Sequence, residues 1–282
     1  MTEQRLRARS ATEIVDAAFQ LYRQDTIEYI AAAAIAYVPW LVIQLVIVLW
    51  SGRAMNTNPG AAIGILVVSV VGTMVVYALM TGVIARLASD AYLGRTATLE
   101  VVAAVRDVLP RVGTLIGAAI MKYLLIIAAG GVVGVLGGLA VVGAPVSWRI
   151  AILIALYILA MAAAIYVAVR YFATTPIIVL ERESAFGSFS RSLTLTRARG
   201  WHVFFTMLLV WFIYFVCFAA LAFGASLLHS PLIVAAAITV YTIAAYPLMG
   251  LVGTVLYYDT RIRGEGFDLE VMARGLQPAA GT

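Results

Sequence analysis

Six long apolar stretches constrain this chain of 282 residues more than any other feature. A membrane-spanning helix needs about 20 mostly apolar residues, and each stretch is long enough. The stretches cover residues 27–50, 61–87, 112–142, 150–172, 201–228 and 232–258. We therefore predict an all-α, polytopic membrane protein with six transmembrane helices, folded as a single integral membrane domain over residues 1–282.

Composition excludes most other classes of protein. Hydrophobic residues make up 63% of the chain and charged residues 12%, whereas a soluble domain carries about 25% charged residues. A soluble domain of this size could not bury so much apolar surface. A soluble enzyme, a disordered protein and a nucleic-acid binder are thus excluded, and no nucleic-acid partner is expected. The single cysteine, Cys217, lies in an apolar run and leaves no disulfide framework to form.

The distribution of basic residues predicts the orientation. Of the 19 Lys and Arg residues, 16 lie before the first span, after the last span, or in the second and fourth connections. Only Arg53 and Arg149 lie on the opposite side, and Lys122 lies within a span. Because positively charged loops stay in the cytoplasm, we expect both termini there, in a multi-pass protein of the cell inner (cytoplasmic) membrane. The abundance of Arg and Ala beside a single Lys suggests a bacterial protein.

The segments that lead into the first, third and fifth spans share one pattern. Ser10, Thr98 and Ser184 are helix-capping residue types, each followed by an amphipathic stretch, and they lie 88 and 86 residues apart. The pattern predicts interfacial helices on the cytoplasmic side and a threefold internal repeat. The alternative is that cytoplasmic loops of small membrane proteins are commonly amphipathic. The predicted repeat units are residues 10–95, 96–183 and 184–270.

All three stretches have an apolar stripe opposite a polar face, and in the second the stripe is Val101, Val105 and Val108. In the first, Ser10 and Glu13 have the spacing of a capping box. Its apolar stripe is Ile14, Ala18 and Leu21. The third has the predicted apolar stripe Phe186, Phe189 and Leu193. Its predicted polar face is Ser188, Arg191 and Ser192.

Lys122 is the one charged residue that lies away from the ends of the spans, and it is the first candidate for a functional intramembrane contact. Its ligand would be a substrate, an ion or a lipid headgroup, and the alternative is a lysine that snorkels along its stem. The helical rise places it about 16 Å from Arg111, near mid-membrane if the span begins there. Gln44 is a second polar candidate, with Thr73 and Thr81, for hydrogen bonds between helices.

Small and aromatic residues suggest further contacts. Gly130, Gly134 and Gly138 recur every four residues, a spacing that favours close helix packing. The alternative is a flexible break that lines a cavity. We expect Trp201, Tyr257 and Tyr258 to anchor the chain in the aromatic belt at the membrane interface.

No catalytic constellation is recognisable in the spans, because a nucleophile with a base, paired carboxylates and metal-ligand spacing are all missing from the sequence pattern. We therefore expect neither a metal nor a cofactor. The acidic residues of interest lie among arginines at the interface: Glu181, Asp259, Glu265 and Asp268. Their simplest interpretation is a salt-bridged helix end.

Several short runs resemble a known family. They are IVDAAF at 14–19, TPIIVLE at 175–181, SRS at 190–192, LTR at 195–197 and LYYD at 256–259, with further matches at 261–268. Together they resemble the membrane domain of glycerophosphoryl diester phosphodiesterases, over nearly the whole chain. The resemblance implies a standalone membrane domain, because the catalytic barrel that some members carry would need a couple of hundred further soluble residues. Phosphodiesterase activity is therefore not expected.

The leading functional hypothesis is a non-catalytic membrane module that organises lipids or a partner membrane protein at the cytoplasmic face. Its amphipathic, arginine-rich segments suit anionic lipid headgroups. The candidate contact residues are Arg191, Arg197, Arg261 and Arg263. Two alternatives are a small-solute transporter or channel with Lys122 near its path, and a membrane-surface lipid enzyme that uses Glu181 or Asp259.

Overall fold

The structure, a computed structural model, describes residues 7–54, 59–95 and 100–276, and over these residues it is helical without β-strands. Six of its helices are long and apolar enough to cross a membrane. These are α2 (Thr26–Ala54), α3 (Pro59–Leu93), α5 (Val112–Gly143), α6 (Val146–Arg170), α9 (Gly200–Ser226) and α10 (Pro231–Glu265). The predicted all-α, multi-pass membrane architecture is confirmed.

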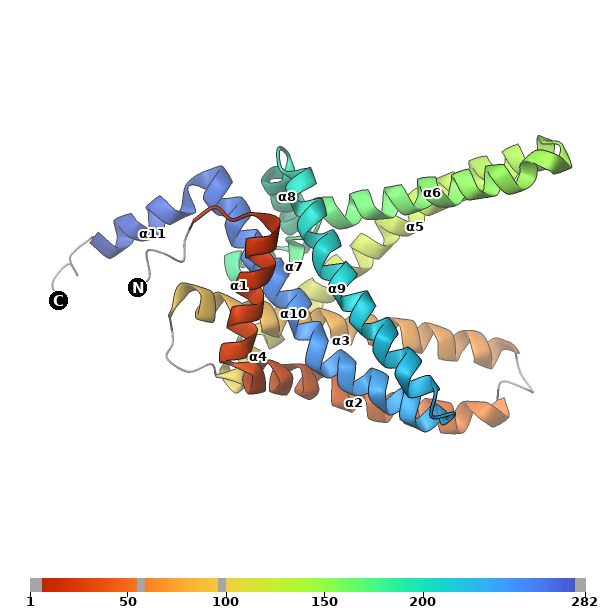
Figure 1. Cartoon of the computed structure of the whole chain (residues 1–282), viewed down its shortest axis with the longest axis horizontal. Coiled ribbons are helices and arrows are strands. Elements are labelled where there is room, and N and C mark those ends of the chain that lie inside the picture. Colours follow the sequence, from red (N-terminus) through yellow and green to blue (C-terminus); the bar gives the residue numbers. More distant parts are fainter. Residues whose placement is uncertain (1–6, 55–58, 96–99, 277–282) are drawn as a thin grey trace.

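The six helices form three antiparallel hairpins, α2–α3, α5–α6 and α9–α10. Figure 1 shows them spreading from a common base, with α5–α6 diverging from the other two. Most fully buried side chains lie at this base, including Tyr29, Ile84 and Tyr257. Further along the hairpins the large apolar side chains are exposed, which is the pattern of helices that face lipid.

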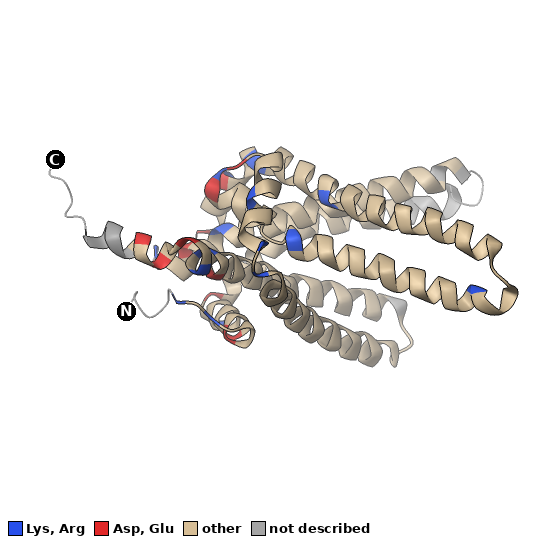
Figure 2. Ribbon diagram, turned by 90° about the horizontal axis from the view of Figure 1, so that it is seen from above, with Lys and Arg blue, Asp and Glu red and all other residues tan. Residues whose placement is uncertain are grey.

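Charged residues gather at the same base. Figure 2 shows Lys, Arg, Asp and Glu concentrated at one end of the bundle, together with the first and last described helices, α1 (Ala11–Gln24) and α11 (Phe267–Leu276). The charged end therefore carries the packed core, while the opposite end consists of hairpin tips.

Three short helices precede the three hairpins: α1, α4 (Val101–Val108) with the 3-10 turn η1 (Leu109–Arg111), and α8 (Ala185–Thr196). Each one packs on the preceding hairpin in cyclic order. Helix α4 contacts α2 and α3, α8 contacts α5 and α6, and α1 contacts α9 and α10. Three repeated units would give this order of contacts. The repeat boundaries stay a prediction, and Thr98 lies outside the described residues.

The capping box of α1 is present, because the Ser10 hydroxyl accepts from the Glu13 backbone N–H and the Glu13 carboxylate accepts from the Ser10 N–H. The predicted stripe of α1 is also buried. The predicted faces of α8 are wrong at three positions, because Ser188 and Ser192 are fully buried and Phe186 is 79% exposed. Phe189 is buried, as predicted. The serines tolerate burial because their hydroxyls donate to backbone carbonyls, that of Ser192 to the last carbonyl of α6.

The expected glycine packing in α5 is wrong for Gly130, Gly134 and Gly138, because a Cβ at these positions would meet no atom within 4 Å. These three glycines instead line an open groove that α6 borders with Leu153 and Tyr157. Gly137 is the glycine that packs, since a Cβ there would overlap the Leu156 side chain of α6. Helix α5 is also continuous through these residues, so the alternative of a break is not observed.

Between α6 and α8 the chain forms a central segment, consisting of α7 (Thr174–Pro176) and the π-helical η2 (Ile177–Glu181). It packs against α3, α5 and α10 at the base of the hairpins. Ile177 and Ile178 are fully buried there. The segment ends at Arg182, whose left-handed backbone (φ 64°) turns the chain toward α8. π-Helical turns are frequent at functional sites.

Candidate functional site

Two interhelical contacts match the polar residues predicted within the first hairpin. The Ser69 hydroxyl donates to Gln44 Oε1 at 3.4 Å, and Trp40 Nε1 donates to the Thr73 hydroxyl at 3.2 Å. Both join α3 to α2. Thr81 instead donates to carbonyls of its own helix. Gln44 therefore has a structural contact between helices.

At the charged end, Arg191 of α8 bridges two glutamates from other elements. Its Nε donates to Glu181 Oε2 at 2.9 Å and its Nη2 to Glu265 Oε2 at 2.8 Å. Arg261 Nε adds a bond to Glu265 at 3.0 Å, and the Tyr257 hydroxyl donates to Glu181 at 2.6 Å. The hydrogen bonds that Arg191 donates to Glu265 and then to Glu181 raise its pKa above the usual value, although burial lowers it. This arginine–glutamate cluster fixes η2, α8 and α10 together.

Asp259 forms a second, separate site. Its side chain is 1% exposed and accepts three hydrogen bonds, from the Arg9 backbone N–H at 2.7 Å, His202 Nε2 at 2.9 Å and Arg263 Nε at 2.8 Å. Arg263 Nη2 also donates to the Arg9 carbonyl at 2.7 Å. The site ties the segment before α1 to α9 and α10. Sequence reasoning missed it, because only the spacing of Asp259 and Arg263 is local.

The structure therefore regroups the predicted acidic residues. Glu181 and Glu265 share arginines, Asp259 lies in its own site, and Asp268 forms no ion pair with any described residue. No group of three or more His, Cys, Asp or Glu side chains within the described ranges could hold a metal ion.

The four arginines predicted to contact lipid or a partner also differ in whether they form ion pairs. Arg191, Arg261 and Arg263 are engaged by carboxylates. Arg197 is exposed and has no ion pair within the described part of the chain. The predicted lipid contacts of these four arginines are not tested by their geometry and stay predictions.

The interfacial role expected for Tyr257 and Tyr258 is wrong, because both are buried. Tyr257 bonds to Glu181, and the Tyr258 hydroxyl lies 2.6 Å from the Ser89 hydroxyl of α3. Burying a tyrosine requires a partner for its hydroxyl, and the charged end supplies both. Trp201, in contrast, is 75% exposed, as an anchor at an interface would be.

A cavity of about 350 Å³ opens at the charged end between α3, the central segment, α10 and α11. Seven charged side chains line it: Arg86, Arg95, Arg111, Arg182, Arg261, Asp107 and Glu270. We call it the arginine cavity. Five arginines face two acidic residues, so the lining has an excess of positive charge.

Two of these arginines have no carboxylate partner among the residues that the structure describes. Arg111 donates to the Ile178 carbonyl at 3.2 Å, and Arg182 forms no ion pair with the residues that the structure describes. Arg86, in comparison, pairs with Asp90 at 2.5 Å and Asp107 at 3.1 Å. Sequence reasoning counted Arg111 and Arg182 only toward orientation, because nothing local indicates that they meet across a cavity.

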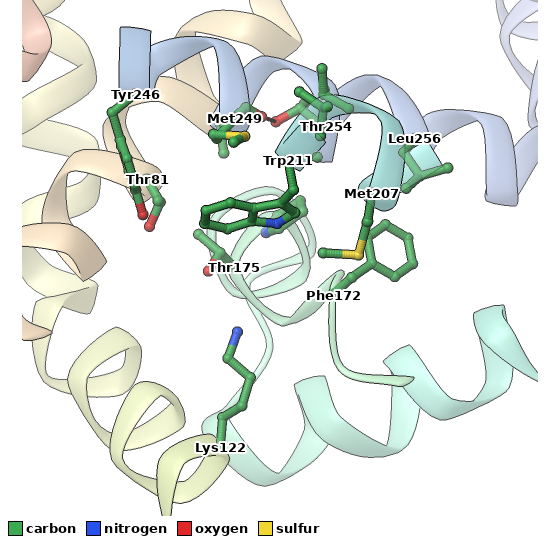
Figure 3. A pocket seen from close by; sticks show the side chains of 16 residues that line it. Thr81, Lys122, Phe172, Thr175, Met207, Trp211, Tyr246, Met249, Thr254 and Leu256 are labelled. Carbon is green, nitrogen blue, oxygen red and sulfur yellow. Dashed lines mark hydrogen bonds between the residues drawn. The ribbon is translucent and has the colours of Figure 1, made fainter. Parts of the chain in front are cut away.

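A second cavity, of about 160 Å³, lies between α3, α5, the central segment, α9 and α10. The central segment lines this second cavity with Thr175 and Pro176, whereas it lines the arginine cavity with Val179 and Leu180. We call the second cavity the Lys122 cavity. Figure 3 shows the Lys122 side chain extending into it, toward Trp211 and Thr175. No Asp or Glu lines the cavity, and Lys122 forms no ion pair with a described residue. An uncompensated charge at the bilayer centre costs at least about 2.5–3.5 kcal/mol, and less near the interface.

The depth of Lys122 follows from the α5–α6 hairpin. Because Gly137 packs against Leu156, the same antiparallel register puts Lys122 level with the C-terminal end of α6, near Arg170. Helix α5 has 32 residues and is about 48 Å long, more than the roughly 30 Å of a hydrocarbon core. Helix α5 is thus longer than one bilayer crossing requires.

Comparison with known families supports the resemblance. Residues 146–262 match the family model described as the membrane domain of glycerophosphoryl diester phosphodiesterase. The match runs from α6 through the central segment, α8 and α9 to most of α10, and it contains Arg191 and Asp259. The predicted similarity to this membrane domain is confirmed for that region. No curated protein matches the chain.

Proposed function

We propose that this integral membrane module is non-catalytic and binds the phosphate of anionic lipid headgroups in the arginine cavity. The observation that carries the proposal is the pair Arg111 and Arg182, two arginines without a carboxylate partner in a cavity of about 350 Å³. The planar guanidinium donates two parallel hydrogen bonds to phosphate oxygens, and it remains charged at any physiological pH.

The position of the cavity fits a lipid ligand. It lies at the base of hairpins whose other surfaces are apolar and exposed, so a headgroup bound there leaves its acyl chains beside lipid-facing helices. The anionic inner leaflet of a cytoplasmic membrane would supply such headgroups. The proposal therefore includes the orientation expected from the basic connections, with both termini in the cytoplasm.

Arg111 and Arg182 are better placed for this role than the arginines singled out from sequence. Arg191 already holds two glutamates, and Arg263 holds Asp259. Of the earlier candidates, Arg261 also lines the arginine cavity. The three carboxylates suited to a lipid enzyme, those of Glu181, Asp259 and Glu265, are each bonded to arginine, which favours structural roles over general acid–base chemistry.

The test is native mass spectrometry of the full chain, released from membranes of equal phosphatidylglycerol and phosphatidylcholine content. We expect wild type to retain phosphatidylglycerol preferentially. The double variant Arg111→Gln/Arg182→Gln should bind phosphatidylglycerol about 30-fold more weakly. Each arginine near an anionic surface contributes about 1 kcal/mol of binding free energy, and the variant loses two of them.

The matched control is Arg23→Gln/Arg106→Gln, which removes two exposed arginines that do not line the cavity. It should retain phosphatidylglycerol within about twofold of wild type. Equal retention by the two double variants would contradict the proposal, because surface charge alone would then explain the preference.

A further inference from the structure

The Lys122 cavity brings together hydrogen-bond donors that have no acceptor. Lys122, Thr175, Trp211 and Tyr246 all line it, and none of their side chains hydrogen-bonds to a described residue. The ammonium and the indole N–H can only donate. Thr81 and Thr254 also line the cavity, but their hydroxyls donate to carbonyls of their own helices. A ligand that completes this site must therefore supply acceptors and a negative charge.

The volume limits the size of the charged group. About 160 Å³ is close to the roughly 150 Å³ of a cavity that binds benzene, so it admits about six non-hydrogen atoms. A carboxylate with its first few methylenes fits this space. A phosphodiester with glycerol on both sides contains more atoms than the cavity holds.

The walls suit a chain that leaves toward the membrane. Phe172, Met207 and Leu256 give the cavity apolar surface beside its donors. Trp211 lines the cavity and is also 38% exposed, so the cavity reaches the lipid-facing surface of α9. A chain attached to a carboxylate at Lys122 can therefore pass Trp211 into the hydrocarbon region.

We propose that the Lys122 cavity binds the carboxylate of a long-chain fatty acid. The Lys122 ammonium neutralises the carboxylate, the hydroxyls of Thr175 and Tyr246 donate to its oxygens, and Trp211 packs on the first methylenes. This site is separate from the arginine cavity in position, charge and ligand. No residue lines both cavities among those that the structure describes.

The probe is palmitate, compared with hexadecanol, which has the same chain length and no charge. Binding to the full chain in neutral detergent is measured by native mass spectrometry. Wild type should bind palmitate at least about tenfold more tightly than hexadecanol, because only palmitate pairs with Lys122. Lys122→Met should lose that difference. Equal binding of the two probes by wild type would overturn the proposal.

Arg149→Met is the matched control, since it removes one positive charge at the tip of the same hairpin, outside the cavity. It should bind palmitate like wild type. If Lys122→Met does not fold, Thr175→Val and Tyr246→Phe decide the question, because each removes one donor and leaves Lys122 in place. Each should weaken palmitate binding about threefold or more, and unchanged binding in both would overturn the proposal.

Two further binding experiments distinguish a fatty acid from a phospholipid as the ligand of the Lys122 cavity. Dioctanoyl phosphatidylglycerol should not displace palmitate, and displacement would assign the cavity to a phosphodiester instead. Arg111→Gln/Arg182→Gln should retain palmitate fully, so a failure of the arginine cavity and a failure of the Lys122 cavity are distinguishable.

Discussion

His202 Nε2 lies 2.9 Å from Asp259 Oδ2, so two residues 57 positions apart join the start of α9 to the last turns of α10. The same carboxylate holds Arg263 and the backbone N–H of Arg9. One buried acceptor thus connects three parts of the chain at the charged end, and its removal should loosen the contacts between all three.

Asp259→Asn should lower the free energy of unfolding by about 1.5–3 kcal/mol, because the hydrogen bonds that the buried carboxylate accepts are charge-assisted. The measurement is thermal or denaturant unfolding in detergent. Asp268→Asn is the control, since Asp268 is half-buried and forms no ion pair with described residues. It should change stability by less than about 0.5 kcal/mol. Equal losses would contradict the role assigned to Asp259.

The first turn of α1 should loosen in acid. The Ser10 backbone N–H, Arg7 and then the Ser10 hydroxyl lower the pKa of Glu13 from 4.5 to about 2. Because the folded-state pKa is depressed, the stabilising contribution is complete above about pH 4.5 and is lost as the pH falls through about 2. Amide exchange at Ile14, corrected for intrinsic rates, should show this loss in wild type. Glu13→Gln should lack that part of the pH dependence.

Two neighbouring tyrosines should respond differently to loss of their hydroxyls. Tyr257 donates to the charged Glu181, whereas Tyr258 shares a hydrogen bond with the neutral Ser89. Tyr257→Phe should cost about 1.5–3 kcal/mol of unfolding free energy and Tyr258→Phe about 0.5–1.5 kcal/mol. Comparing the two unfolding midpoints checks the order, and the reverse order would argue against the bond to Glu181.

Alanine at two glycines of α5 should separate packed from open positions. Gly137→Ala forces a Cβ into Leu156 and should cost about 1–3 kcal/mol. Gly134→Ala meets nothing within 4 Å and should be neutral, or stabilising by up to about 1 kcal/mol through helix propensity. Unfolding of both variants in detergent checks this. A comparable loss at Gly134 would mean that its face is covered.

The spans were predictable because long apolar runs are a local signal. Residues 112–142 were expected and α5 covers Val112–Gly143. The end of α10 was not predictable from hydropathy. Expected to end near residue 258, the helix runs to Glu265. In its last two turns, Asp259 pairs with Arg263 and Arg261 pairs with Glu265, each four residues apart. Such pairs stabilise a helix that has no apolar periodicity.

The candidate sites were much less predictable than the spans. Lys122 stood out because a lone charge in an apolar run is visible in sequence, but its cavity is assembled from five separate parts of the chain. Arg111 and Arg182 are 71 positions apart and meet only through the central segment. The burial of Ser192 in α8 was not predictable from the sequence, because the carbonyl that accepts from its hydroxyl belongs to α6.

The docking of α1 on the last hairpin has a consequence for biosynthesis. Helix α1 is synthesised before the other described helices, yet most of the surface that receives it belongs to α9 and α10. Asp259, which holds Arg9, is synthesised about 250 residues later. The main docking surface of α1 is therefore absent until α9 and α10 have been translated and inserted. A nascent chain stopped before α10 would leave α1 undocked.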